Sequence, residues 1–200
     1  MIETIGVLAG SGWAAGINLY LVTLMLGIAG RAGWADIPEV LTRLDVMIVA
    51  GVLFAIEFVA DKVPFLDSFW DVIHTVIRPL GAAALGAVIA GESASIGTAV
   101  GAAVAGALAL DAHAAKASTR VVVNTSPEPI SNIGLSLVED VGVAGLVTLA
   151  VTYPVPTLIV VAILVVAATA FTIWIWRIAR RSWKKLGTWL EDQAWYPSAG

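Results

Sequence analysis

The feature that most constrains this chain is its long uncharged stretches, the first of which runs from Thr4 to Gly30. A helix that spans a bilayer needs about 20 mostly apolar residues, because lipid offers no partner for backbone N–H and C=O groups. Only 13% of the residues are charged and 59% are hydrophobic, whereas about 25% of a soluble domain is charged. The sequence therefore predicts an all-α integral membrane protein.

Further apolar runs predict about six transmembrane helices. The second covers residues 44–60, and the third covers residues 79–91, which is short for a crossing and is expected to continue a preceding helical piece or to tilt. The apolar run of residues 93–110 forms the beginning of the fourth. The uncharged run between Asp140 and Arg177 is divided by Tyr153-Pro154-Val155-Pro156. Proline removes a backbone donor and disfavours helix at the preceding residue, so we expect a tight turn there between spans five and six.

The last apolar run ends in an aromatic and basic flank, which predicts the orientation. Trp174 and Trp176 precede five basic residues, Arg177, Arg180, Arg181, Lys184 and Lys185. Aromatic residues favour the membrane interface and basic residues favour the cytoplasmic side. With six spans, both termini are predicted to be cytoplasmic. Residues 1–182 are expected to form one polytopic domain, and residues 183–200 an interfacial amphipathic helix or a tail.

Composition also excludes several classes of function. The chain has 11 Lys and Arg against 15 Asp and Glu, a net charge of −4, so no nucleic-acid partner is predicted. It has no cysteine, which excludes disulfides and iron–sulfur clusters. It also lacks a phosphate-binding loop, a zinc-protease helix motif and a dinucleotide fingerprint. We therefore predict no cofactor, with a divalent cation as the one candidate.

Two charge-rich, proline-containing helix breaks are the unusual feature. If a helix starts near Pro64, four polar residues at spacings of four, three and four form one stripe. These are Asp67, Asp71, His74 and Arg78. Glu57 and Asp61 share a face at the end of the preceding span, next to Lys62.

The second break shows a similar stripe with spacings of three, four and four. It consists of His113, Lys116, Arg120 and Asn124. After Pro127 and Pro129, further polar residues recur on one helical face: Asn132, Ser136 and Glu139, with Asp140 adjacent. A charge at the centre of a membrane helix costs about 2.5–3.5 kcal/mol, so such residues usually face a bundle interior. The alternative is that both breaks are loops with solvated charges.

A shift of 63 positions aligns the two breaks, matching Glu57 with Arg120, Asp61 with Asn124, Pro64 with Pro127 and Ser68 with Ser131. The match suggests an internal repeat of two helix–break–helix units, a plan found in transporters. If the repeat is real, Glu57 and Arg120 could pair across its axis.

At these segments the sequence resembles a bacterial membrane family known as domain of unknown function 4126. The resemblance rests on residues 57–64, on Asp71, His74, Thr75, Arg78 and Pro79, on residues 124–129, and on Ser131, Asn132, Glu139 and Asp140. It implies a compact helical protein of the bacterial inner membrane and no particular activity.

Transport is the function that this pattern favours: a small transporter or permease moving an ion, a small polar solute or a lipid phosphate. Its candidate pathway residues are Glu57, Asp61, Lys62, Asp67, Asp71, His74, Arg78, His113, Lys116, Arg120, Asn124, Asn132, Glu139 and Asp140. His74 is the candidate proton relay, with Asp71 one turn away favouring its charged form, and Arg120 suits a phosphate.

Two other classes of function stay open. The first is an intramembrane enzyme in which Asp67, Asp71 and His74 hold a divalent metal, with Glu139 or Asp140 completing the shell. The second is an accessory subunit of a membrane complex. Expected partners are membrane lipids, with a homo-oligomer or a complex partner as further candidates.

Overall fold

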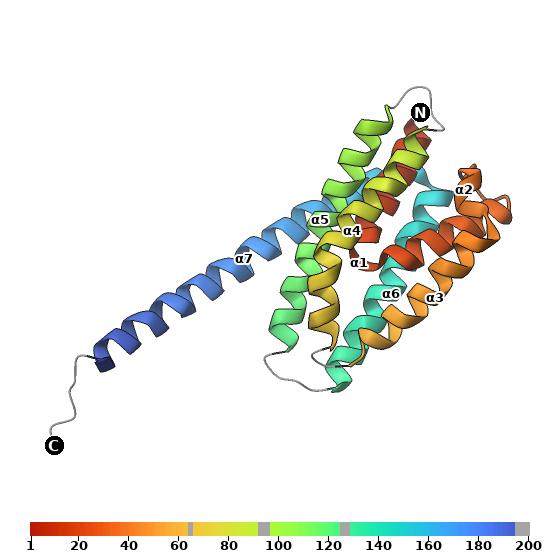
Figure 1. The fold of residues 1–200 in the computed structure, drawn as a ribbon. Helices are drawn as coiled ribbons and strands as arrows, with labels where there is room; N and C mark the ends of the chain where they lie inside the picture. Colours follow the sequence, from red (N-terminus) through yellow and green to blue (C-terminus); the bar gives the residue numbers. More distant parts are fainter. Residues whose placement is uncertain (64–65, 92–96, 125–128, 195–200) are drawn as a thin grey trace, which may run out of the picture.

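The computed structural model describes residues 1–63, 66–91, 97–124 and 129–194. Within these ranges the chain is helical and has no strand (Figure 1). The helices are α1 (Ile2–Arg31), α2 (Glu39–Thr42), α3 (Leu44–Ala60), α4 (Leu66–Gly91), α5 (Thr98–Val123), α6 (Pro129–Thr152) and α7 (Pro154–Ala194).

Five of these helices are long and apolar enough to cross a membrane: α1, α4, α5, α6 and the part of α7 up to Trp183. The predicted second span, α3, has 17 residues, which is about 26 Å at about 1.5 Å per residue and falls short of a bilayer core of about 30 Å. The prediction of an all-α, multi-pass membrane protein is confirmed, whereas the count of six crossings is not.

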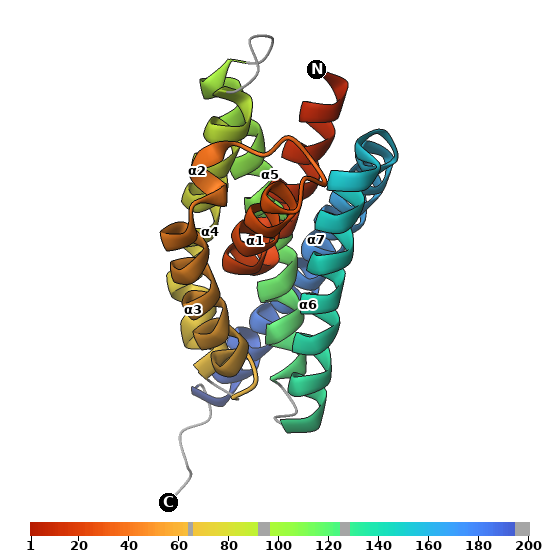
Figure 2. The ribbon, with the colours of Figure 1, turned by 90° about the vertical axis from the view of Figure 1, so that its right-hand side faces the viewer.

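Helix α1, predicted as one continuous span, is broken at Asn18. This residue has φ −148° and ψ 95°, which is extended rather than helical backbone. Its side-chain oxygen accepts a hydrogen bond from the backbone N–H of Leu21 at 2.9 Å, as an N-cap residue does for a new helix. After the break, the second half of α1 runs across the bundle towards α2 (Figures 1 and 2).

The break changes the path of the chain. The N-terminus lies at one end of the bundle, and α7 leads the C-terminus towards the opposite end, where α3 and α5 finish and α4 and α6 begin (Figures 1 and 2). The sequence predicted both termini on one side. The arrangement differs because the second half of α1 lies across the bundle, so α1 and α3 do not form two successive full crossings.

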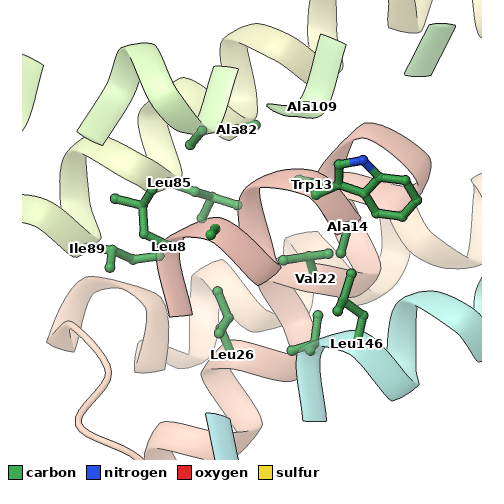
Figure 3. Packing of buried hydrophobic residues seen from close by; sticks show 14 of the residues in the cluster. Leu8, Trp13, Ala14, Val22, Leu26, Ala82, Leu85, Ile89, Ala109 and Leu146 are labelled. Carbon is green, nitrogen blue, oxygen red and sulfur yellow. The ribbon is translucent and has the colours of Figure 1, made fainter. Parts of the chain in front are cut away.

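Helix α1 is the centre of the bundle and contacts all six other helices. Small residues let the backbones of neighbouring helices approach closely. A Cβ at Gly16 would meet the backbone carbonyl of Ala109, and one at Gly86 would meet that of Gly101. Figure 3 shows Leu85 and Ile89 of α4 beside Leu8 of α1 in the apolar core.

Two proline-containing segments behave differently. The predicted turn before Pro154 is present, because Tyr153 alone separates α6 from α7. Pro79, in contrast, lies inside α4, which is continuous from Leu66 to Gly91; the predicted preceding helical piece and the third span are one helix. Helix α7 extends from Pro154 to Ala194, and its candidate span ends at Trp183.

Candidate functional site

Charged side chains from α3, α4, α5 and α6 converge inside the end of the bundle where α4 and α6 begin. Glu57, Asp67 and Arg78 are fully buried, and the other members are mostly shielded. We refer to the following residues as the polar network: Asn18, Glu57, Asp61, Lys62, Asp67, Asp71, Arg78, His113, Lys116, Arg120, Asn124, Asn132, Glu139 and Asp140. The interpretation of these segments as solvated loops is therefore wrong for the described residues.

Arg78 forms the first centre of the network. One of its terminal nitrogens, Nη2, donates to Glu57 Oε1 at 2.5 Å, and the other, Nη1, donates to Asp71 Oδ1 at 3.1 Å. Nη1 also lies 2.8 Å from Nδ1 of His113. Arg78 thus joins α3, α4 and α5 near the middle of α4.

Arg120 forms the second centre. Its Nη2 donates to Glu139 Oε2 at 2.9 Å, while Nη1 donates to the backbone carbonyl of Asp61 at 3.2 Å and to Asn132 Oδ1. Asp67 Oδ2 lies 3.5 Å from Nη1 of Arg120. The Asp61 carbonyl follows the end of α3, where carbonyls lack helical partners, so Arg120 joins α3, α5 and α6.

Asp67 is held mainly by amide donors. Asn132 Nδ2 donates to its Oδ2 at 3.1 Å, and Asn124 Nδ2 lies 3.3 Å from the same oxygen. The backbone N–H of Ser68 donates to Oδ1 at 2.6 Å. This carboxylate therefore ties the first turn of α4 to the end of α5 and the start of α6.

Lys116 connects the network to the break in α1. Its Nζ donates to Asp61 Oδ2 at 2.6 Å and to the backbone carbonyl of Ile17 at 3.2 Å, and it lies 3.4 Å from Glu139. The Ile17 carbonyl ends the first half of α1, where a cation is favoured by the helix dipole.

The second half of α1 is joined to the network by Asn18. Its Nδ2 donates to Asp140 Oδ1 at 3.0 Å, so this amide bridges α1 and α6. Lys62 Nζ lies 4.0 Å from Asp140 Oδ2 and donates to Ser136 Oγ at 3.2 Å. The broken ends of α1 are thus both bound by charged residues of the network.

Hydrogen-bond partners define the state of His113. Arg78 donates to its Nδ1, which must therefore accept and carry no proton. Its Nε2–H then donates to Thr75 Oγ1 at 3.0 Å, and the Thr75 hydroxyl donates to the Asp71 carbonyl at 3.0 Å. His113 is a neutral imidazole in this arrangement.

His74 sits beside the network rather than in it. Its Nδ1 donates to the Trp70 carbonyl at 2.8 Å, and its Nε2 lies 3.2 Å from the Tyr20 hydroxyl. The predicted partner Asp71 directs its bonded oxygen to Arg78 instead. A relay through His74 would therefore run to Tyr20 of α1.

The network is deep as well as buried. Asp67 and Arg78 are 11 residues apart on α4, which is about 16 Å at about 1.5 Å per residue. This is about half of a bilayer core of about 30 Å. The other half of α4 packs in the apolar core, with Ala82, Leu85 and Ile89 buried.

Acidic groups outnumber basic ones in the network. Among the described residues it holds six carboxylates, Glu57, Asp61, Asp67, Asp71, Glu139 and Asp140, against four cations, Lys62, Arg78, Lys116 and Arg120, a surplus of two negative charges when all are ionised. Several buried oxygens also have no hydrogen-bond partner: Glu57 Oε2, Asp61 Oδ1, Asp71 Oδ2 and Asp140 Oδ2. Two buried donors of the network, Arg78 Nε and Arg120 Nε, also lack a partner. Unpaired buried charge is costly, so the surplus of two negative charges suits the network to take up positive charge.

The predicted metal cluster is not assembled. The described residues include no group of three or more His, Asp or Glu side chains placed to hold a metal ion. Asp67 binds asparagine side chains, Asp71 binds Arg78, and His74 binds Trp70 and Tyr20. Asp67 is engaged by donors from outside α4, and Asp71 is engaged by Arg78 within the same helix. The residues of this stripe therefore do not form one set of metal ligands.

The predicted pairing of Glu57 with Arg120 is also replaced. Glu57 pairs with Arg78 at 2.5 Å, and Arg120 pairs with Glu139 at 2.9 Å. Each helix–break–helix unit thus has an ion pair between the end of its first helix and the middle of its second, with the charges reversed between units. This supports the idea of a repeat while correcting its contact.

The break in α1 and its contribution to the site were not predicted from the sequence. Asn18 was its only strongly polar side chain between Gly16 and Tyr20, and this isolated amide inside an apolar span was the available signal. Tyr20 and Thr75 were also missed, because a single hydroxyl in a membrane helix usually bonds its own backbone.

Fold and site together define a multi-pass helical membrane protein with a buried ionic network. The model of a family described as "Domain of unknown function (DUF4126)" matches residues 5–176. Since this covers most of the chain, the protein belongs to that family, as the resemblance of its two charged segments indicated. Comparison with curated proteins and with solved structures found no match.

Proposed function

We propose that this protein is a small transporter whose polar network carries protons or a monovalent cation. The observation that carries the proposal is the surplus of buried carboxylates, in which Glu57 Oε2 and Asp61 Oδ1 have no hydrogen-bond partner. Two positive charges would neutralise the network, so it is suited to bind and release them. Ionisable residues inside a membrane are characteristic of proton relays and ion pathways.

Anion transport is less well supported by the same geometry. The terminal nitrogens of Arg78 and Arg120 are occupied by carboxylates, an amide, a carbonyl and His113. A phosphate or other anion would have to displace these partners. A cation can bind to the carboxylate oxygens that have no hydrogen-bond partner, and it would not displace any contact of Arg78 or Arg120.

The broken α1 suggests how the site could change its access. Discontinuous helices at a polar site are a recurring plan in transporters, and their free ends bind charged groups there. Here Lys116 holds the Ile17 carbonyl and Asp140 holds Asn18. A change in the charge of the network would alter both contacts, so the extended backbone at Asn18 is the proposed hinge.

The orientation follows from the basic end of α7. Arg177, Arg180 and Arg181 favour the cytoplasmic side of a bacterial inner membrane. Figure 1 places the end of α7 towards the same end of the bundle as the start of α4 and α6. In this proposed orientation the network lies in the cytoplasmic half of the bundle, and the N-terminus lies on the periplasmic side.

The transport proposal is tested in proteoliposomes that contain a pH-sensitive dye and carry an imposed proton or potassium gradient. The unmodified protein should dissipate the gradient, and Glu57→Gln should reduce the rate at least tenfold, because the variant removes a buried site of positive-charge uptake. Glu39→Gln is the matched control, since Glu39 is exposed in α2 and should leave the rate unchanged.

Equal rates for Glu57→Gln and the unmodified protein would refute the role of the network. Equal amounts of each variant in the vesicles, and equal elution in size-exclusion chromatography, separate loss of transport from loss of folding.

Orientation is tested by cysteine labelling of a chain that has no cysteine of its own. In intact cells, a membrane-impermeant reagent should label Glu3→Cys and should label Ser182→Cys only after lysis. The opposite labelling pattern would show that the protein has the reverse orientation in the membrane. Labelling of both positions from outside would contradict the path of the chain.

A further inference from the structure

A groove of about 700 Å³ lies between α5 and α7, and these two helices are on the other side of the bundle from α3 (Figure 1). Its wall on α5 runs from Leu110 to Val121, and its wall on α7 runs from Ile175 to Trp183. Both helices are long and apolar enough to span a membrane up to these positions, so we expect the groove to face the lipid. Of the residues of the polar network, the groove is lined only by His113.

The groove is apolar along its length but differs at its two ends. At the basic end, Arg180 lines the groove together with Trp176 and Trp183. At the inner end, Thr75 and His113 line it through the hydrogen bond that joins them at 3.0 Å. A ligand that fits must therefore have a long apolar part and one anionic end.

The length of the groove matches one lipid chain. Leu110 and Val121 are 11 residues apart on α5, which is about 16 Å at about 1.5 Å per residue. One leaflet of a bilayer core of about 30 Å has about the same thickness. An acyl chain in the groove would place its headgroup at the level of Arg180, where tryptophans also prefer to lie.

We infer that this groove binds a membrane phospholipid with an anionic headgroup, held by Arg180, with one acyl chain reaching the Thr75–His113 pair. The chain would cover this hydrogen bond, which leads through Arg78 into the polar network. The protein would thus carry a lipid site that touches its transport site from the bilayer side. The inference stands on the groove itself and needs no transport activity.

Native mass spectrometry of the full chain, released from nanodiscs that contain equal amounts of phosphatidylglycerol and phosphatidylcholine, tests the inference. We expect one retained phosphatidylglycerol per chain. Arg180→Gln should lower its retention about fivefold, the change that corresponds to about 1 kcal/mol for one basic residue near an anionic lipid surface. Arg181→Gln is the matched control, because it removes the same charge at the same depth but does not line the groove.

A second pair of variants tests the apolar part. Ala117→Phe fills the groove and should abolish retention of the lipid, whereas Ala107→Phe adds the same bulk at an exposed position of α5 that does not line it. Three results would overturn the inference: equal retention of both lipids by the unmodified protein, equal losses in Arg180→Gln and Arg181→Gln, or a dimer that Ala117→Phe dissociates and that does not depend on the headgroup. The last result would assign the groove to a second copy of the chain.

Discussion

The two halves of α4 hold the bundle together in opposite ways. In the first half, Asp67 contacts two amide side chains from outside α4. Arg78 contacts Glu57 of α3 and His113 of α5, and it also pairs with Asp71 within α4. In the second half, Gly86 lies against the backbone of Gly101, and Leu85 and Ile89 pack in the apolar core. Both halves of this one helix contain buried residues, so burial alone does not distinguish a functional site from an apolar core.

The two halves of α4 differ in whether their contacts can rearrange. A small-residue contact works only if the backbones approach closely, and it has one stable arrangement. An ionic network can redistribute protons and partners while its helices remain in place. We therefore expect the apolar half to act as the fixed part of the bundle and the polar half as the part that responds to charge.

Removal of a network cation should have the largest effect on stability. Arg78→Met leaves Glu57 and Asp71 without their shared partner, and breaking a buried ion pair from one side costs about 3–5 kcal/mol. The free energy of unfolding is measured by titration with SDS in mixed micelles. As a control, Arg43→Gln removes an exposed partner of Asp45 and should give no measurable change.

Enlarging a residue in the apolar half should have the next largest effect. At Gly86, the Cβ of an alanine would meet the Gly101 carbonyl and the Ala105 side chain, and overpacking costs about 1–3 kcal/mol. Gly142→Ala has no atom within 4 Å of the added Cβ and should be neutral or stabilise the helix by up to about 1 kcal/mol. Equal effects of the two variants would mean that α4 and α5 are not closely packed.

The junction of the two halves is tested at Asn18. Asn18→Ala removes the cap on Leu21 and the bond to Asp140, and loss of such a cap costs about 1 kcal/mol. Asn18→Ser should recover part of this loss, because its hydroxyl can still cap the helix. If both variants were as stable as the unmodified protein in the same titration, α1 would not depend on this cap.

Neutralising a network acid should have the smallest effect on stability. Glu57→Gln keeps an oxygen that can accept from Arg78 and reduces the surplus of acids from two to one, so we expect a loss of about 1 kcal/mol or less. Arg78→Met and Glu57→Gln are expected to differ in their loss of unfolding free energy only if the network has a surplus of negative charge. Equal losses in the two variants would show that the network is balanced and would remove the argument for uptake of positive charge.

The class of the protein and most residues of the polar network could be predicted from the sequence. The stripes at Asp67, Asp71 and Arg78 and at His113, Lys116 and Arg120 were predicted from helical spacing, and the structure brings them together. What spacing could not give was the choice of partners. Glu57 selects Arg78 and not Arg120, because the partner depends on how α3, α4 and α5 pack.

By itself, the sequence determined that the chain enters a membrane as helices and that its charges fall on defined helical faces, since both follow from local periodicity and from the need of backbone groups for partners in lipid. Only the tertiary structure decided that α1 breaks at Asn18. An extended residue in an apolar span is stable only when other helices supply partners for the exposed backbone and cap. Here Lys116 and Asp140, about 100 residues or more away in the chain, supply them.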